Sequence, residues 1–115
     1  MLVPGGHQLC VTMQAAATGT GNGTDIEVGG TSDGGFTVLD MHVEGINGDT
    51  ITFRGTIDGT NYIDLQCENL NNSISGTTAT ADGIYRFVVG GVQSFRAAVT
   101  TYSAGTITVT GVATA

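Results

Sequence analysis

Residues 94–112 read SFRAAVTTYSAGTITVTGV, and apolar side chains recur along this stretch at every second position. A period of two is typical of a strand that buries one face, because successive side chains of a strand point to opposite sides. Ser103, Ala104 and Gly105 interrupt the alternation with small residues, which predicts a hairpin turn between two strands. The inward positions are predicted to be Phe95, Ala97, Val99, Ile107 and Val109.

The same alternation runs outward through most of the chain, and no segment shows the helical period of 3.6. The segment 69–81 is polar and fits either a long connection or a strand at 73–80 on a sheet edge. Asp58-Gly59-Thr60 is a tight-turn signal and predicts a hairpin between 50–57 and 61–67. The further strands are predicted at 8–16, 25–28, 36–44 and 84–89. Their inward side chains, with those of the predicted hairpin, are predicted to be Leu9, Val11, Met13, Leu39, Met41, Val43, Ile51, Phe53, Ile57, Ile63, Leu65, Cys67, Tyr85, Phe87 and Val89.

Eight or nine short strands at a spacing of about 8 to 12 residues predict an all-β fold, an antiparallel β-sandwich that is jelly-roll-like. The 115 residues have the usual size of one domain. We therefore expect a single β-sandwich domain over 1–115, in which 1–7 and 18–35 are rich in loops and form a possible attachment region.

The composition indicates how such a sheet meets its surroundings. The chain holds 19 Gly and 19 Thr but no Lys, one Pro, and only 11% charged residues, where about 25% is usual. Sheets commonly protect their edges with Lys or Pro, and this chain has little of either. The edges are therefore covered by neighbouring subunits, which predicts a homo-oligomer, or they are shielded by loops in a monomer.

The net charge of -7 argues against nucleic acid as a partner, and the lack of a long apolar stretch argues against a membrane. Nucleic-acid binding depends on neutralising phosphates with Lys and Arg, and the chain has three Arg against ten acidic residues. No stretch approaches the roughly 20 apolar residues that cross a bilayer. The first residues also lack the basic and apolar regions of a secretory signal, so we expect a cytosolic origin.

Cys10 and Cys67 are too few for a disulfide framework, and they lie on opposite phases of their predicted strands. Two free thiols are the favoured interpretation, with a single bridge as the alternative.

Few side chains suit catalysis. Only His7 and His42 could act as a base for a nucleophile, and His42 lies between Asp40 and Glu44 on a predicted polar strand face. A surface ion pair is the ordinary outcome there, so we expect no enzyme; a small hydrolase is the formal alternative.

The same three side chains, Asp40, His42 and Glu44, project from one strand face, as a small metal site would need. One strand rarely supplies a closed set of ligands, so a solvated face is favoured. The turns with Asp and Gly, such as Asp58-Gly59, lack the repeated acidic spacing of a calcium loop. We therefore expect no cofactor and no metal.

Tyr62 and Tyr102 are predicted to lie on the sides of their strands away from the apolar face. Exposed aromatic rings serve either as platforms for sugars or as anchors in protein interfaces. Interface anchoring is favoured, and the apolar start of the chain joins the two tyrosines as a candidate. The interface candidates are Met1, Leu2, Val3, Pro4, Tyr62 and Tyr102.

About half of the chain, 53–112, carries a pattern of short motifs that punctuate the strands. These motifs are Phe53-Arg54-Gly55-Thr56, Asp58-Gly59-Thr60-Asn61-Tyr62, Gly83-Ile84-Tyr85-Arg86, Phe95-Arg96-Ala97 and Tyr102-Ser103-Ala104-Gly105-Thr106-Ile107-Thr108-Val109. The pattern resembles the small β-sandwich decoration or cement proteins of tailed bacteriophage virions, and modules of tail and fibre components.

The resemblance implies a structural protein that binds the outer face of an assembled capsid and stabilises the shell. Its partner would be the major capsid protein, and its own state often a homotrimer. Its location would be the capsid surface of the virion, which is assembled in the host cytoplasm. We expect the capsid-facing surface at the N-terminal region. The alternative is a receptor- or glycan-binding module of a phage tail, fibre or baseplate.

Overall fold

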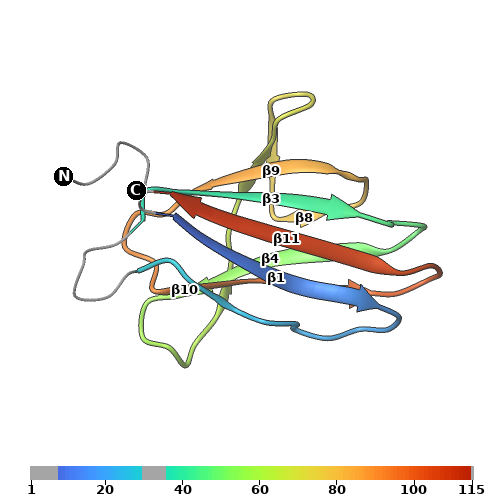
Figure 1. The fold of residues 1–115 in the computed structure, drawn as a ribbon, viewed down its shortest axis with the longest axis horizontal. Coiled ribbons are helices and arrows are strands. Elements are labelled where there is room, and N and C mark those ends of the chain that lie inside the picture. The colour runs from blue at the N-terminus through green and yellow to red at the C-terminus, as the bar shows by residue number, and fades with distance from the viewer. Residues whose placement is uncertain (1–7, 30–35, 115) are drawn as a thin grey trace.

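Two antiparallel β-sheets pack against each other in the computed structural model, which describes residues 8–29 and 36–114 (Figure 1). This confirms the predicted all-β sandwich. Six strands have six or more residues: β1 (Gln8–Ala17), β3 (Val38–Glu44), β4 (Thr50–Thr56), β9 (Gly83–Val88), β10 (Ser94–Thr101) and β11 (Ile107–Thr114). Five have two or three: β2 (Ile26–Glu27), β5 (Ile63–Asp64), β6 (Cys67–Asn69), β7 (Ile74–Gly76) and β8 (Thr78–Ala79). These short strands bring the total to eleven described strands, above the eight or nine predicted.

Except for the pairs β4–β5 and β6–β7, described strands that follow one another along the chain lie in different sheets. The larger sheet has the order β1-β11-β3-β9-β6-β7 and the smaller has β2-β10-β4-β5, with β8 also paired to β4. The chain thus crosses the sandwich from β1 to β2, β3 and β4, and again from β9 to β10 and β11. This alternation, which places the last strand beside the first, is the jelly-roll arrangement that the sequence predicts.

The predicted hairpin within 94–112 is wrong. β10 belongs to the smaller sheet and β11 to the larger one, so the connection at 102–106 crosses from one sheet to the other. Both strands bury one apolar face in the same core from opposite sides. Alternation shows which side chains point inward, but it carries no information about the sheet in which a strand lies.

The hairpin predicted at Asp58-Gly59 is present, since β4 pairs with β5 through Arg54 with Asp64 and Gly55 with Ile63. It is much shorter than predicted. Beyond Leu65 the chain leaves the smaller sheet, joins the larger one as β6 beside β9, turns back as β7 and returns to β4 as β8. The segment 69–81 therefore contains two short strands, of which β7 is an edge strand.

Because of this departure, two of the predicted inward side chains are exposed. Ile57 lies just beyond the end of β4 and is 74% exposed, and Ile63 is 63% exposed. The strand alternation that placed Ile57 with Ile51 and Phe53 ends at the turn, so the inward prediction fails for Ile57. Cys67 is buried, as predicted, but from the other sheet.

The core between the sheets is built around four aromatic rings. Phe53 of β4 lies 5.4 Å from Tyr85 of β9, and Phe95 of β10 lies 4.6 Å from Phe87 of β9, both between ring centroids. Aromatic pairs at such distances contribute beyond the area they bury. Met13 is fully buried, and Leu9 and Val11 are partly buried against the core, as predicted.

Two further predictions concern the cysteines and the loops. Cys10 and Cys67 are both free thiols, the first exposed and the second buried, which confirms the favoured interpretation. The described part of 18–35 is mostly loop, with β2 as its only regular strand. No helix among the described residues is long and apolar enough to cross a membrane.

Candidate interaction surface

One end of the sandwich gathers the start of β1, β3 and β10 and the end of β4, β9 and β11, as their antiparallel registers require. We call this end the terminal pole; it lies at the left of Figure 1. The turn between β4 and β5 and the turn between β9 and β10 both belong to it. The predicted attachment segment 1–7 leads into β1 here, although its own residues lie outside those that the structure describes.

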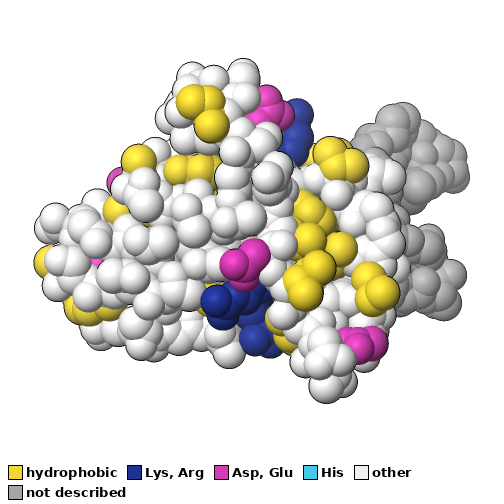
Figure 2. All heavy atoms as spheres, turned by 180° about the vertical axis from the view of Figure 1, so that it is seen from behind, with side chains coloured by type: hydrophobic (Ala, Val, Ile, Leu, Met, Phe, Trp, Pro, Cys, Tyr) yellow, Lys and Arg dark blue, Asp and Glu magenta, His cyan; other side chains and the backbone are white. Residues whose placement is uncertain are grey.

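An apolar hollow of about 270 Å³ opens at the terminal pole, on the side of the smaller sheet. Its lining is mainly aliphatic and comes from the two turns, and Figure 2 shows hydrophobic side chains gathered beside the arginines on this face. Exposed apolar side chains that cluster are one feature of interaction surfaces, which makes this hollow the candidate. The hollow is lined by Gly55, Thr56, Ile57, Asp58, Asn61, Ile63, Leu65 and Val92.

Gly55 forms the floor of the apolar hollow because it has no side chain. A Cβ built on Gly55 would lie 2.6 Å from Cδ1 of Leu65 and 3.1 Å from Cγ1 of Val92. The first distance is shorter than carbon atoms tolerate and the second is tight, so a larger residue would displace the Leu65 side chain and require a small shift of Val92. The glycine therefore sets the depth of the site.

The rim of the apolar hollow is a turn closed by side-chain hydrogen bonds. The Asp58 carboxylate accepts bonds of 2.8 Å from the backbone N–H groups of Thr60 and Asn61 and a third from the Asn61 amide. The Thr56 hydroxyl donates to Asp58 and accepts from the Gly59 N–H. These bonds, led by that from the Asn61 N–H, hold the pKa of Asp58 well below its usual range. The exposed Ile57 is thus carried on a well-ordered turn.

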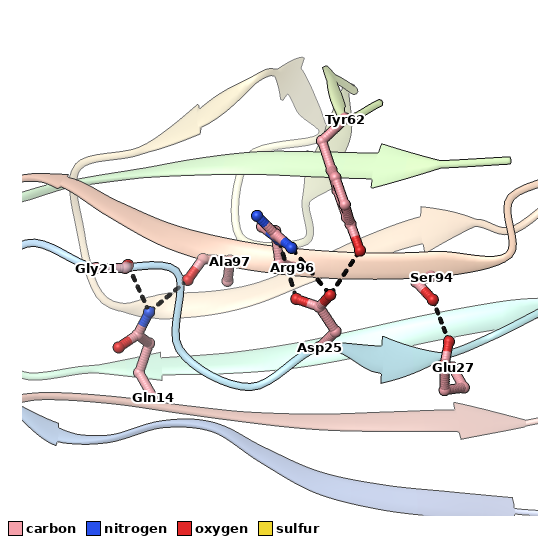
Figure 3. Close-up of polar contacts among 8 residues, drawn as sticks. All are labelled: Gln14, Gly21, Asp25, Glu27, Tyr62, Ser94, Arg96 and Ala97. Atoms are coloured by element: carbon pink, nitrogen blue, oxygen red, sulfur yellow. Dashed lines mark hydrogen bonds and ion pairs between the residues drawn. The ribbon is translucent and has the colours of Figure 1, made fainter. Parts of the chain in front are cut away.

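Next to the apolar hollow, charged side chains form a row across the smaller sheet, which we call the arginine row: Asp25, Arg96, Arg54 and Asp64. Arg96 and Arg54 are direct neighbours in the β10–β4 register. Arg96 binds Asp25 through two hydrogen bonds of 2.9 and 3.1 Å (Figure 3). Arg54 binds Asp64 through one of 3.0 Å. Each cation therefore has its own carboxylate.

Tyr62 covers one end of the arginine row, where it contacts both Arg96 and Asp25. Its ring centroid lies 3.6 Å from the Arg96 guanidinium carbon, a cation–π contact, and its hydroxyl donates a 2.6 Å hydrogen bond to Asp25. This bond to a carboxylate, followed by burial, raises the pKa of Tyr62. One face of the ring is thus occupied by Arg96, and Tyr62 ties the β4–β5 turn to the segment before β2.

Two further sets of polar contacts hold β2 and the loop before it in place. The Ser94 hydroxyl donates to Glu27, and the Gln14 amide donates to Ala97 O at 2.8 Å and to Gly21 O at 3.1 Å (Figure 3). Gln14 is buried and its amide nitrogen is satisfied by these two carbonyls. The loop before β2 is therefore held against both sheets.

Of the other interface candidates, the structure describes only Tyr102, and it lies apart from the apolar hollow. Tyr102 is partly buried against the core, and its hydroxyl donates a 2.7 Å bond to Gly105 O in the crossing at the opposite pole. Met1, Leu2, Val3 and Pro4 lie outside the described residues. Of the predicted candidates, the structure thus places only Tyr62 beside the apolar hollow.

His42 lies on the outer face of the larger sheet, with its Nδ1 3.2 Å from Glu44 Oε1. Asp40 is turned to Arg86, which binds it through two hydrogen bonds of 2.8 and 3.2 Å. These three side chains therefore pair in two directions instead of converging. Over residues 8–29 and 36–114, no group of three or more His, Cys, Asp or Glu is placed to hold a metal ion.

A second hollow, of about 220 Å³, lies beside the β6–β7 hairpin and is lined by polar and apolar side chains alike. The side-chain oxygens of Asn69 and Asn72 accept bonds from the backbone of this hairpin. Buried Cys67 and the side of Tyr85 form its inner wall. Burial alone raises the pKa of the Cys67 thiol, so it remains protonated at neutral pH.

Sequence comparison finds no family model and no curated protein that matches the chain. Solved structures do match in fold. The crystal structure of the SPBc2 prophage-derived protein YomS has a TM-score of 0.83 at 20% identity, covering 94% of this chain and 93% of that one. The PBSX exported protein XepA has a TM-score of 0.85 at 14% identity, covering 94% of this chain but 38% of XepA. The chain thus shares the fold of YomS and of one part of XepA.

Proposed function

We propose that this protein is a structural component of a tailed-phage virion, a decoration or cement protein that binds the outer face of the capsid. Its partner is the major capsid protein, and the terminal pole is the surface that docks. The observation that carries this proposal is the apolar hollow, with Ile57 and Ile63 exposed on an ordered rim. The shared fold with a prophage-derived protein and an exported protein of PBSX supports a phage origin.

The physical basis is burial of aliphatic surface repeated over many copies. Full burial of one exposed isoleucine contributes roughly 1.5–3 kcal/mol. A decorated shell presents the same contact many times, and a copy that bridges two capsid subunits gains from multivalency. The net charge of -7 keeps such a protein away from nucleic acid, so a role outside the DNA-filled shell fits its electrostatics.

The test is binding to purified, expanded capsids, followed by sedimentation of the particles. Ile63→Asp removes an aliphatic side chain of the apolar hollow and places a charge there, and we expect binding to weaken at least tenfold. Ile74→Asp is the matched control, since Ile74 is 65% exposed but lies on β7, away from the hollow. Equal binding by wild type and Ile63→Asp, with both folded, would refute docking through the hollow.

The attachment segment can be tested in the same assay. Deleting residues 1–6 removes the chain that leads into β1 at the terminal pole, and weaker particle binding by a folded variant is expected. Full occupancy by this variant would limit docking to the apolar hollow.

The hollow beside the β6–β7 hairpin favours a second function, recognition of a receptor or glycan by a tail, fibre or baseplate. Its wall carries Asn69, Asn72, Ser75, Thr78 and Thr80, whose amide and hydroxyl groups suit the hydroxyls of a sugar. Binding of the isolated protein to a glycan array, lost in Asn72→Ala, would favour this function over decoration.

A further inference from the structure

The sandwich has four sheet edges, and three of them are formed by very short described strands. β2, β5 and β7 have two or three residues each, whereas β1 has ten. Short edge strands offer few free backbone groups to another chain, which is one way that proteins avoid edge-to-edge pairing. β1 is therefore the single long edge among the described strands.

β1 also lacks the residues that usually block an edge. Its sequence, QLCVTMQAAA, contains no charge, no proline and no glycine. Its second half is covered from within, because Met13 O accepts a 2.8 Å bond from the Thr24 N–H and Gln14 bonds the loop before β2. The register with β11 is regular over Gln8–Thr12 and shifts beyond it. With respect to the described residues, the open part of the edge is thus 8–12.

The side chains of this open stretch are suited to a partner strand. Leu9 and Val11 point to the core but remain partly exposed at its margin. Cys10 and its neighbours Gln8 and Thr12 are exposed on the outer face. A strand placed beside β1 would complete the burial of Leu9 and Val11 without covering a charge.

The open residues 8–12 are self-complementary, because an antiparallel second copy would set apolar side chains beside apolar ones and polar side chains beside polar ones. Two copies of charge -7 repel each other, yet β1 and the adjacent β11 contain no charged residue. Asp25, which follows Thr24 beside Met13, is paired with Arg96 of the smaller sheet. The charge distribution therefore permits a second copy as that strand.

We propose that two copies pair through β1, antiparallel and around a twofold axis at Cys10. Leu9 then faces Val11 of the second copy, and Gln8 faces Thr12. The larger sheets of both copies join into one continuous sheet. This pairing involves only the protein itself, so it occurs in a purified sample whether or not the protein decorates a capsid.

The first test is the mass of the full chain in solution under reducing conditions, by sedimentation over a range of concentrations. We expect a particle of twice the 11.6 kDa chain mass. Cys10→Lys sets two like charges opposite each other at the axis and should weaken association at least tenfold. Thr110→Lys adds the same charge to an exposed site on neighbouring β11 and should leave the dimer intact.

The second test is cross-linking with dissolved oxygen and a copper catalyst, in which two thiols form one disulfide and oxygen takes up the electrons. Opposite residues of antiparallel strands have Cα atoms about 4.5–5.5 Å apart, within the range that a disulfide spans. A covalent dimer should form in wild type and be absent in Cys10→Ser, which keeps its non-covalent dimer.

Three results would overturn the proposal. One is a monomer at every concentration up to about 1 mM. Another is a trimer or larger assembly whose mass Cys10→Lys does not change. The third is a dimer that appears only when residues 1–6 are deleted, because the edge would then belong to the chain's own N-terminal residues.

Discussion

Arg96 stands directly opposite Arg54 in the β10–β4 ladder, so two of the three cations of the chain are neighbours on one face. Like charges in that position destabilise a sheet. Asp25 and Asp64 at the two ends of the row compensate for this, and they do so unequally. Arg96 and Asp25 are only 19% and 28% exposed, whereas the Arg54–Asp64 pair is more open to solvent.

This inequality predicts different costs for two matched substitutions. Asp25→Asn leaves Arg96 without its carboxylate and weakens the Tyr62 bond, so the free energy of unfolding should fall by about 1–3 kcal/mol. Asp64→Asn should cost less than about 1 kcal/mol, as exposed ion pairs do. Urea unfolding of both variants measures the difference. Equal losses of stability would contradict the inference that the Arg96–Asp25 pair contributes more than the Arg54–Asp64 pair.

A second prediction concerns two glycines with the same backbone conformation and different surroundings. Gly45 has φ +86°, and a Cβ there would lie 1.8 Å from Thr106 O; Gly59 has φ +80° with nothing within 4 Å. Gly59→Ala should cost about 1–2 kcal/mol from backbone strain. Gly45→Ala should cost clearly more or prevent folding, because the crossing at 102–106 must move. Thermal unfolding of the pair separates strain from steric overlap.

The free energy of unfolding should decrease as the pH is lowered below about 4. The buried carboxylate of Asp49 accepts bonds from the N–H groups of Ser103, Asn47 and Ala104, and the Ser103 bond is the main cause that lowers the pKa of Asp49. A lowered folded pKa stabilises the fold above the unfolded pKa of about 3.9 and loses that effect as the pH falls toward the folded pKa. Asp49→Asn should be less stable at pH 7 and should lose less stability between pH 5 and 2. A parallel decline of both proteins would count against Asp49.

The two thiols should react at very different rates. In a dilute, reduced sample, Cys10 is exposed, while Cys67 is buried and has a raised thiol pKa. A thiol reagent at pH 8 should modify one cysteine in the folded protein and two in 8 M urea. Fast labelling of Cys67 without denaturant would mean that the β6–β7 hairpin opens readily.

The sequence predicts much of the sandwich because alternation acts over adjacent residues. Leu39, Met41 and Val43 of β3, and Tyr85, Phe87 and Val89 near β9, are buried as the alternation predicts. The sheet to which a strand belongs depends on contacts between distant residues, so the pairing of 94–101 with 107–114 was wrong. For the same reason, the sequence does not predict that the chain joins the larger sheet at β6 and β7.

The candidate site was harder to predict than the fold. Ile57 and Ile63 read as core residues, yet both flank the Asp58-Gly59 turn, where strand alternation ends and side chains can point outward. That flanking position is the signal in the sequence that could have identified them. The partner of Tyr62 could not be found in this way, since Asp25 lies 37 positions earlier and meets it only through the fold.

Phe53 marks the place where the chain departs from and rejoins the smaller sheet. Its carbonyl accepts the Leu65 N–H and its own N–H donates to Thr77 O, each at 2.9 Å. The residues on either side of the stretch 66–76 are therefore both hydrogen-bonded to Phe53, so the two ends of this stretch lie close together. Its tip at 71–73 is exposed. Residues inserted there would lengthen a loop, and the entropic cost of closing a loop grows only slowly with its length. A foreign peptide spliced into that tip would be displayed without altering how β4 meets β10.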